Sequence, residues 1–127
     1  ASAKSVLNAN YLAEQVDMEV PYEPFHHEFA ATAGDAAAAD VAKRMLDFGV
    51  HPPTTNWPEM VPEAMLTEPT EIESKQSLDD LAAAFDAALG STEEERHDAP
   101  SRTTARRIDQ TSAARDPRLS WQALDEE

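Results

Sequence analysis

The sequence predicts a small two-layer α+β domain followed by an extended C-terminal tail. Apolar residues recur at helical spacing in three segments, and two short strand-like segments lie between them. The resulting order, helix, strand, helix, strand, helix, places helices over one face of a small sheet. Since 127 residues of which 41 % are hydrophobic can build one compact core, we predict a single domain over residues 1–90. Residues 91–127 are then a linker and an extended tail.

The first helix is predicted over residues 3–15. Its small and apolar residues cover most of the helix surface, so we expect it to be buried between layers. Prolines at positions 21 and 24 separate it from the next segment, residues 25–31. In that segment Phe25, His27 and Phe29 alternate with other residues, which is typical of a strand.

The second helix is predicted over Ala36–Phe48, directly after Asp35. Gly49 supplies its end, and the prolines that follow prevent its continuation. Residues 51–62 contain four prolines and are therefore predicted to form an irregular loop. Ala64–Thr67 is a plausible short strand that leads out of this loop.

The third helix has the clearest pattern, with apolar residues at helical spacing from Leu78 to Leu89 and Gly90 at its end. Two capping boxes are possible near its start, Thr70 with Glu73 and Ser77 with Asp80. The start of this helix is thus fixed only to within one or two turns. From Ser91 onward, polar residues predict the linker and tail.

The formal charge of −15 limits the partners of this chain. Such a surface repels nucleic acid and anionic membranes, so neither is expected to bind. Many acidic residues, many alanines and few lysines are typical of a halophilic protein. Molar salt screens the repulsion between its acidic side chains, since the Debye length falls to roughly 3 Å at 1 M. The chain has no cysteine and no apolar run of the ~20 residues that span a bilayer. A cytoplasmic location is the simplest expectation.

The charge is unevenly distributed along the chain. Residues 98–118 hold five arginines against three aspartates, whereas the body is strongly acidic and the chain ends in Asp125-Glu126-Glu127. The basic segment could dock onto an acidic neighbour, or it could be a solvated tail, and composition alone leaves both open.

Among the four histidines, His51 is the strongest candidate for chemistry. It lies directly after a predicted helix end, and two prolines stiffen its loop, so we expect its imidazole to be held in a fixed position. The alternative is a loop histidine bonded to a nearby carbonyl group. A metal site formed by His26, Glu28 and His51 can be imagined, but we expect side chains that line an interface or pocket without a metal.

Carboxylates gather where the second predicted strand meets the third helix. Glu71 and Glu73 are explained by a first helical turn, where negative charge complements the helix dipole. Glu68 precedes a proline and is therefore extended, which makes it harder to explain as a cap.

Nearly the whole chain resembles one family. The segments that carry the resemblance occur in the same order as in that family and cover most of the predicted elements. They are Ser5–Ala13, His27–Phe29, Asp40–Thr54, Leu66–Glu71, Ser74–Phe85, Ala99–Pro100, Thr103–Asp109 and Ala113–Pro117. In these segments the chain resembles glycine dehydrogenase (decarboxylating), the P-protein of the glycine cleavage system, at the end of its second subunit.

The resemblance implies the small C-terminal domain of the aspartate-aminotransferase-like fold, which is pyridoxal-phosphate fold type I. Family members decarboxylate glycine with pyridoxal phosphate and transfer the aminomethyl group to the lipoyl arm of H-protein. Their Schiff-base lysine lies in a large domain upstream of every matched segment, and none of the three lysines here has similar surroundings. The resemblance thus implies a fragment that does not hold the cofactor by itself.

The resemblance also suggests site residues and partners. We expect His51 and Thr54 to act at the active-site mouth, and Glu68 and Thr70 to contact glycine or the lipoyl arm. No cofactor-binding or metal-binding residue is expected in the chain. The implied partners are subunit 1 of the P-protein, the large domain and lipoylated H-protein. The alternative function is a non-catalytic, acidic interaction module of a halophile.

Overall fold

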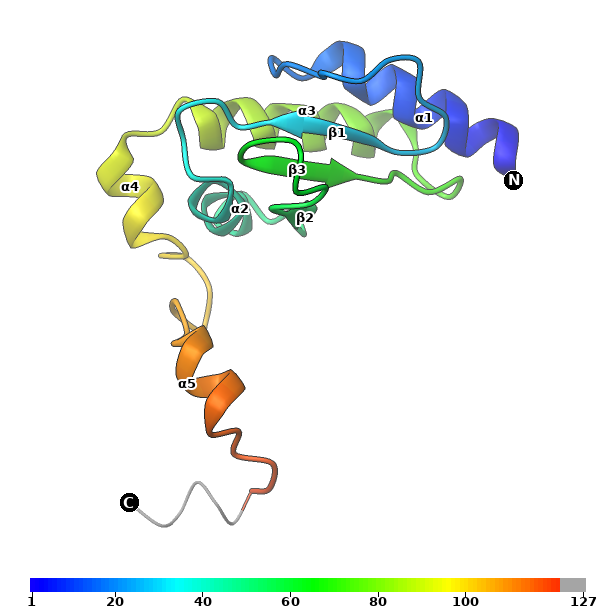
Figure 1. The fold of residues 1–127 in the computed structure, drawn as a ribbon. Helices are drawn as coiled ribbons and strands as arrows, with labels where there is room; N and C mark the ends of the chain where they lie inside the picture. Colours follow the sequence, from blue (N-terminus) through cyan, green and yellow to red (C-terminus); the bar gives the residue numbers. More distant parts are fainter. Residues whose placement is uncertain (122–127) are drawn as a thin grey trace.

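A computed structural model describes residues 1–121 of the chain as an α+β body with a projecting C-terminal segment (Figure 1). Residues 122–127, which include the predicted acidic end, lie outside the described part. In chain order the elements are α1 (Ser2–Gln15), β1 (Phe29–Thr32), α2 (Ala38–Leu46), β2 (Thr54–Thr55), β3 (Ala64–Thr67), α3 (Lys75–Leu89), α4 (Glu93–Asp98) and α5 (Gln110–Arg115).

The three strands form one antiparallel sheet in the order β1-β3-β2. Phe29 pairs with Thr67 at one end of the β1–β3 ladder, and Thr54 pairs with Leu66 on the other side of β3. The predicted strand at residues 64–67 is confirmed. The first strand begins later than predicted, so His26 and His27 lie in bends before it and not on opposite strand faces. The predicted irregular loop contains β2, because two threonines pair with β3 between its prolines.

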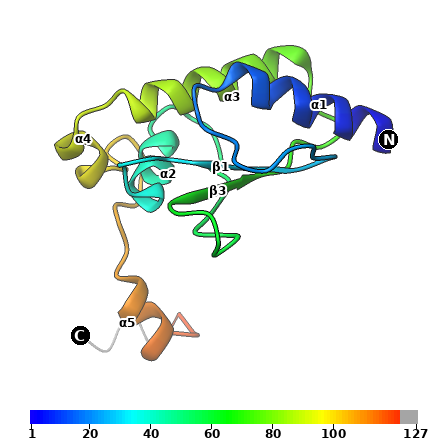
Figure 2. The same cartoon turned by 45° about the horizontal axis from the view of Figure 1, so that its top comes forward.

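The core lies between the sheet and the helices, as predicted for a two-layer domain. Figures 1 and 2 show α1 and α3 side by side along one face of the sheet. One buried cluster joins residues of α1, α2, α3, β1 and β3. Its largest fully enclosed side chains are Phe85, Leu12, Met45, Met65 and Val41. This core fixes the positions of the loops at the ends of the strands.

Helix α1 has its predicted position, but it is not buried on most faces. Asn8, Ala9 and Leu12 are buried, whereas Leu7 on the opposite side is 66 % exposed. Helix α3 packs along one side of α1. Tyr11 strengthens that contact, because its hydroxyl donates a hydrogen bond to Asp79 of α3.

Helix α2 begins two residues later than predicted, at Ala38, and its first backbone N–H is capped by a distant side chain. The Glu63 carboxylate accepts a hydrogen bond of 2.7 Å from the Ala38 N–H, where its charge also complements the helix dipole. Asp35 does not cap this helix, since the N-cap position is Ala37 and has no side-chain cap. The cap therefore depends on the tertiary fold.

Helix α3 begins at Lys75, with a capping box that neither predicted pair supplies. Ser74 accepts from the Ser77 N–H, and the Ser77 hydroxyl in turn accepts from the Ser74 N–H. Ser77 replaces the usual Glu or Gln because its hydroxyl already reaches the backbone at 2.9 Å. Gly90 ends the helix as predicted, but with right-handed backbone angles.

Residues 91–107 form a strap that folds back over α2 after the end of α3. Helix α4 packs against α2, and the Arg107 guanidinium lies 2.6 Å from Asp40 of α2. Arg107 also donates to the carbonyl groups of Ala99 and Arg96, which closes the strap on itself. Beyond the strap, α5 projects away from the body (Figure 1). The predicted division of the chain at residue 90 stays a prediction.

The strap is anchored on Asp47, whose side chain is 0 % exposed. Its carboxylate accepts hydrogen bonds from the backbone N–H groups of Ser101 and Arg102, at 2.7 and 2.6 Å. The Ser101 hydroxyl and the Arg44 guanidinium donate the other two, at 3.1 and 3.2 Å. Burial raises the pKa of Asp47, but these hydrogen bonds outweigh it and hold the pKa below its usual value of 3.8. Asp47 is therefore an ionised, fully bonded link between α2 and the strap.

Candidate functional site

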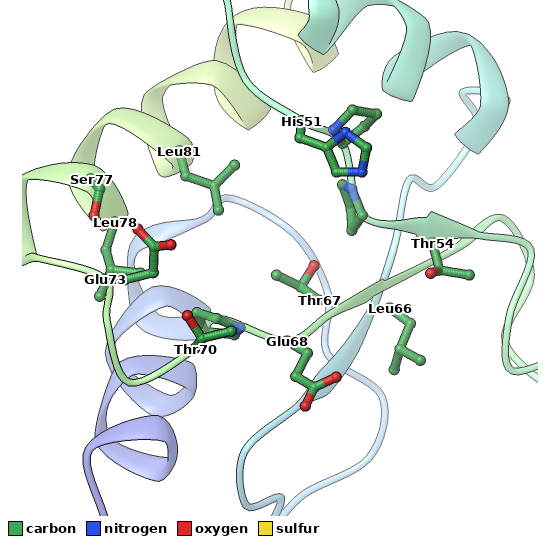
Figure 3. Close-up of a pocket in the computed structure, with 13 residues that line it drawn as sticks. His51, Thr54, Leu66, Thr67, Glu68, Thr70, Glu73, Ser77, Leu78 and Leu81 are labelled. Carbon is green, nitrogen blue, oxygen red and sulfur yellow. The ribbon is translucent and has the colours of Figure 1, made fainter. Parts of the chain in front are cut away.

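A pocket of about 360 Å³ opens between the loop after α2, the end of β3 and the first half of α3 (Figure 3). Three chain segments that are distant in sequence meet there because β3 lies in the middle of the sheet. The residues that line the pocket are His51, Pro52, Pro53, Thr54, Leu66, Thr67, Glu68, Pro69, Thr70, Glu73, Ser77, Leu78 and Leu81. All four residues proposed as site residues from the sequence are among them.

The loop of His51 and Thr54 is set in place at both of its ends. Helix α2 ends at Leu46, two residues before its predicted end, and Gly49 in the following turn has φ at +80°, a left-handed conformation that side chains with a Cβ rarely adopt. At the other end Thr54 pairs with Leu66 in the sheet. The prolines at 52 and 53 lie between these fixed points and form part of the pocket wall. The exposed imidazole of His51 thus stands at the pocket rim.

Glu68 borders the pocket, but its carboxylate turns to the side away from α3 (Figure 3). There it lies 3.7 Å from the imidazole Nε2 of His27. Side chains of successive residues in an extended chain point to opposite sides. The side chain of Glu68 therefore points to the same side as that of Leu66, whereas the side chain of Thr67 faces α3. His51 and Glu68 therefore stand on different sides of the segment that follows β3.

The backbone at Thr70 is held by α1. The side-chain amide of Asn8, itself buried, donates a hydrogen bond of 2.8 Å to the Thr70 carbonyl oxygen. This bond fixes the turn between β3 and α3, which lines one side of the pocket. Asn8 was not predicted as a site residue. Its signal in the sequence was an amide on the face of α1 that also carries Leu12.

Thr67 lines the pocket itself and was not predicted as a site residue. Its side chain is directed into the space between His51 and Leu81 (Figure 3). The residue is only 4 % exposed, and its hydroxyl has no hydrogen-bond partner among residues 1–121. The sequence signal was a polar residue in a predicted strand, two positions after the buried Met65 and so on the same face.

The lining does not fit pyridoxal phosphate. A Schiff base requires a lysine, and none of the lysines at positions 4, 43 and 75 is among the described residues around this pocket. Glu73 would face the cofactor phosphate, and the described lining holds no lysine or arginine to compensate it. Within residues 1–121, no group of three or more histidine or acidic side chains could hold a metal ion.

No helix in the described part of the chain is long and apolar enough to cross a membrane.

Comparison with known proteins gives a consistent family. Residues 1–107 match the family model described as "Glycine dehydrogenase, C-terminal domain". The chain is 72 % identical over 125 residues to the "Probable glycine dehydrogenase (decarboxylating) subunit 2" of Halobacterium salinarum, which covers 98 % of this chain. Proteins with the same name from Thermoplasma volcanium and Thermus thermophilus are each 42 % identical, over 94 % and 95 % of the chain.

The chain spans about a quarter of these relatives, 26 % of the first two and 27 % of the third. The matched residues include every part of the pocket and the strap up to Arg107, so the site described above lies inside the family's own boundaries. This chain belongs to the glycine dehydrogenase C-terminal domain family, as the resemblance in its sequence indicated.

Proposed function

We propose that the chain acts as the C-terminal part of a P-protein, which decarboxylates glycine with pyridoxal phosphate and transfers the aminomethyl group to the lipoyl arm of H-protein. In this proposal the pocket of His51, Thr54 and Thr70 forms one wall of a composite active site, with Glu68 at its edge. Within the type I fold, this body is the small domain. The proposed setting is a salt-adapted cytoplasm, which the charge of −15 supports.

One observation carries the proposal: four residues chosen from separate sequence segments line a single pocket. The positions of His51 and Thr54 depend on the end of α2, and those of Glu68 and Thr70 on the end of β3. An interaction module without a substrate has no need for this convergence. A wall built on strand and helix ends is typical of binding sites, because a rigid scaffold positions the loops.

The cofactor is assigned to the part of the P-protein outside this chain. When bound there, pyridoxal phosphate supplies the electron sink for decarboxylation. The residues of this chain would then orient the substrate and exclude water. His51 would hold or move a proton at its imidazole. The chain alone is expected to be inactive, and subunit 1 and H-protein are proposed partners.

The test is reconstitution in molar salt. This chain would be combined with the remaining three quarters of the Halobacterium salinarum subunit 2 and with its subunit 1, and glycine–carbon dioxide exchange would be measured. We expect exchange only when all parts are present. His51→Ala should lower it by about 100-fold, since a positioned proton-transfer group contributes roughly that much.

His26→Ala is the matched control, because His26 is exposed, lies outside the pocket and should leave exchange unchanged. Absence of exchange in an assembled, cofactor-loaded complex would contradict the proposal and favour the interaction module. An equal loss in both histidine variants would contradict the role of His51.

A further inference from the structure

We propose that this pocket accepts an uncharged, mostly apolar group whose one hydrogen-bonding function pairs with the hydroxyl of Thr67. The inference rests on the proposed function in that it assigns a ligand class to the same pocket. It is carried by an unpartnered side chain that no sequence pattern marked as functional.

The Thr67 hydroxyl is the exception among the buried polar side chains of the described chain. Asn8 donates to Thr70, and Asp47 accepts four hydrogen bonds. Thr67 is as well buried as these residues, yet its oxygen has no partner within residues 1–121. An unmade hydrogen bond at a buried hydroxyl costs about 1–3 kcal/mol, so native proteins rarely leave one.

The direction of the hydroxyl identifies where its partner belongs. Thr67 shares a strand face with Met65, which is fully enclosed in the core. At Thr67, however, the core ends and the pocket begins, since His51 and Leu81 stand apart across the opening (Figure 3). The side chain is directed toward this space, but its oxygen exposes less than 1 Å², so a group that enters the pocket bonds to the hydroxyl once the lining side chains shift slightly.

The lining selects for an uncharged group. Leu78 and Leu81 form the wall on α3, and Pro52, Pro53 and Pro69 form much of the rest. An anion would meet the carboxylate of Glu73, and the described lining holds no lysine or arginine to compensate it. A cation would lose hydration against leucine and proline, and the half-buried Glu73 compensates it only at the edge.

Hydrogen-bonding capacity sets the second requirement. A threonine hydroxyl both donates and accepts, so an amide, with a carbonyl and an N–H, matches it in either sense. Hexanamide is therefore a suitable probe, because it combines a neutral amide with a short alkyl chain. Hexanoate and hexylammonium have similar length and carry the two charges that the lining disfavours.

The experiment is a titration of the full 127-residue chain in molar salt, followed by methyl and amide NMR signals. With hexanamide we expect shifts at Thr67, Leu78 and Leu81. Thr67→Val, which keeps the side-chain shape, should weaken binding about 5- to 10-fold, as expected for one neutral hydrogen bond. Thr67→Ser, which keeps the hydroxyl, should stay within about twofold of the parent chain.

Thr55→Val is the control, because Thr55 lies in β2 but outside the pocket lining. Equal hexanamide affinity in the parent and Thr67→Val chains would overturn the inference, as would equal or tighter binding of either charged probe. Absence of shifts in a folded chain would overturn it as well. Glycine–carbon dioxide exchange does not measure this affinity, so the proposed function can stand or fall separately.

Discussion

Asp47 and Thr67 are both polar and almost fully enclosed, but the fold satisfies one and leaves the other open. Four donors surround the carboxylate of Asp47, two of them from the backbone of the strap. Thr67 has none within the described chain. The difference separates two uses of buried polar groups. A group with all its hydrogen bonds made holds chain segments together, whereas an unpartnered group beside a pocket is available to a ligand.

Removal of the Asp47 carboxylate should have the largest effect on the free energy of unfolding. In Asp47→Ala, Arg44 and the N–H groups of Ser101 and Arg102 lose their acceptor, and we expect a loss of about 3 kcal/mol in the free energy of unfolding. Denaturant unfolding in molar salt measures it. Amide hydrogen exchange at Ser101 and Arg102 should accelerate if the strap detaches. Asp98→Ala, at an exposed position, should change neither quantity.

Acid should act on the same link more weakly, because a protonated Asp47 can still accept some of its hydrogen bonds. Hydrogen bonding holds the pKa of Asp47 below 3.8 in the folded state. Its contribution is therefore present above the unfolded-state pKa and is lost as the pH falls through the lower, folded-state value. Unfolding curves between pH 3 and pH 5 should show this loss in the parent chain. The same pH dependence in Asp47→Ala would assign it to other carboxylates.

Thr67→Val should shift stability in the opposite direction. The substitution removes a buried, unpaired hydroxyl and keeps the side-chain volume, so we expect a gain of about 1 kcal/mol in the absence of ligand. The midpoint of denaturant unfolding measures it. A clear loss of stability would mean that the hydroxyl is already bonded, and would remove the contrast with Asp47. Thr55→Val serves again as the control within the sheet.

The smallest effect is expected at the outer end of the strap. Arg107→Ala removes the ion pair with Asp40 at 2.6 Å and the hydrogen bonds to the carbonyl groups of Ala99 and Arg96, but the guanidinium is about one third exposed. Solvent and salt screen such a pair, so we expect a loss of about 0.5 kcal/mol. If this loss equalled that of Asp47→Ala, the strap would be held along its length and not mainly at Asp47.

Local patterns predicted most of the fold. The leucines and Phe85 of α3 repeat at helical spacing, and β3 follows a proline-rich loop, so both elements were visible in the sequence. The paired strand of Thr54 and Thr55 was not, because two residues carry no periodic signal and their pairing depends on β3. The Glu63 cap of α2 is equally non-local, since it joins positions 25 residues apart.

The candidate site was predicted in part, and for a similar reason. His51 was singled out by its proline-braced loop, and Thr54, Glu68 and Thr70 by resemblance. The buried states of Thr67 and Asp47 arise only when distant segments pack. Asp47 did leave one clue: an acidic residue at a helix C-terminus opposes the helix dipole and usually requires compensating partners.

The two-residue strand β2 has a consequence beyond the pocket. It forms one border of the sheet, and Pro53 precedes it directly, so this border offers another chain little backbone to pair with. Exposed edge strands allow sheets of different molecules to pair edge to edge and aggregate. Short edge strands flanked by proline suppress this aggregation. The prolines that form part of the pocket wall therefore also protect this edge of the sheet from polymerisation when the chain is concentrated.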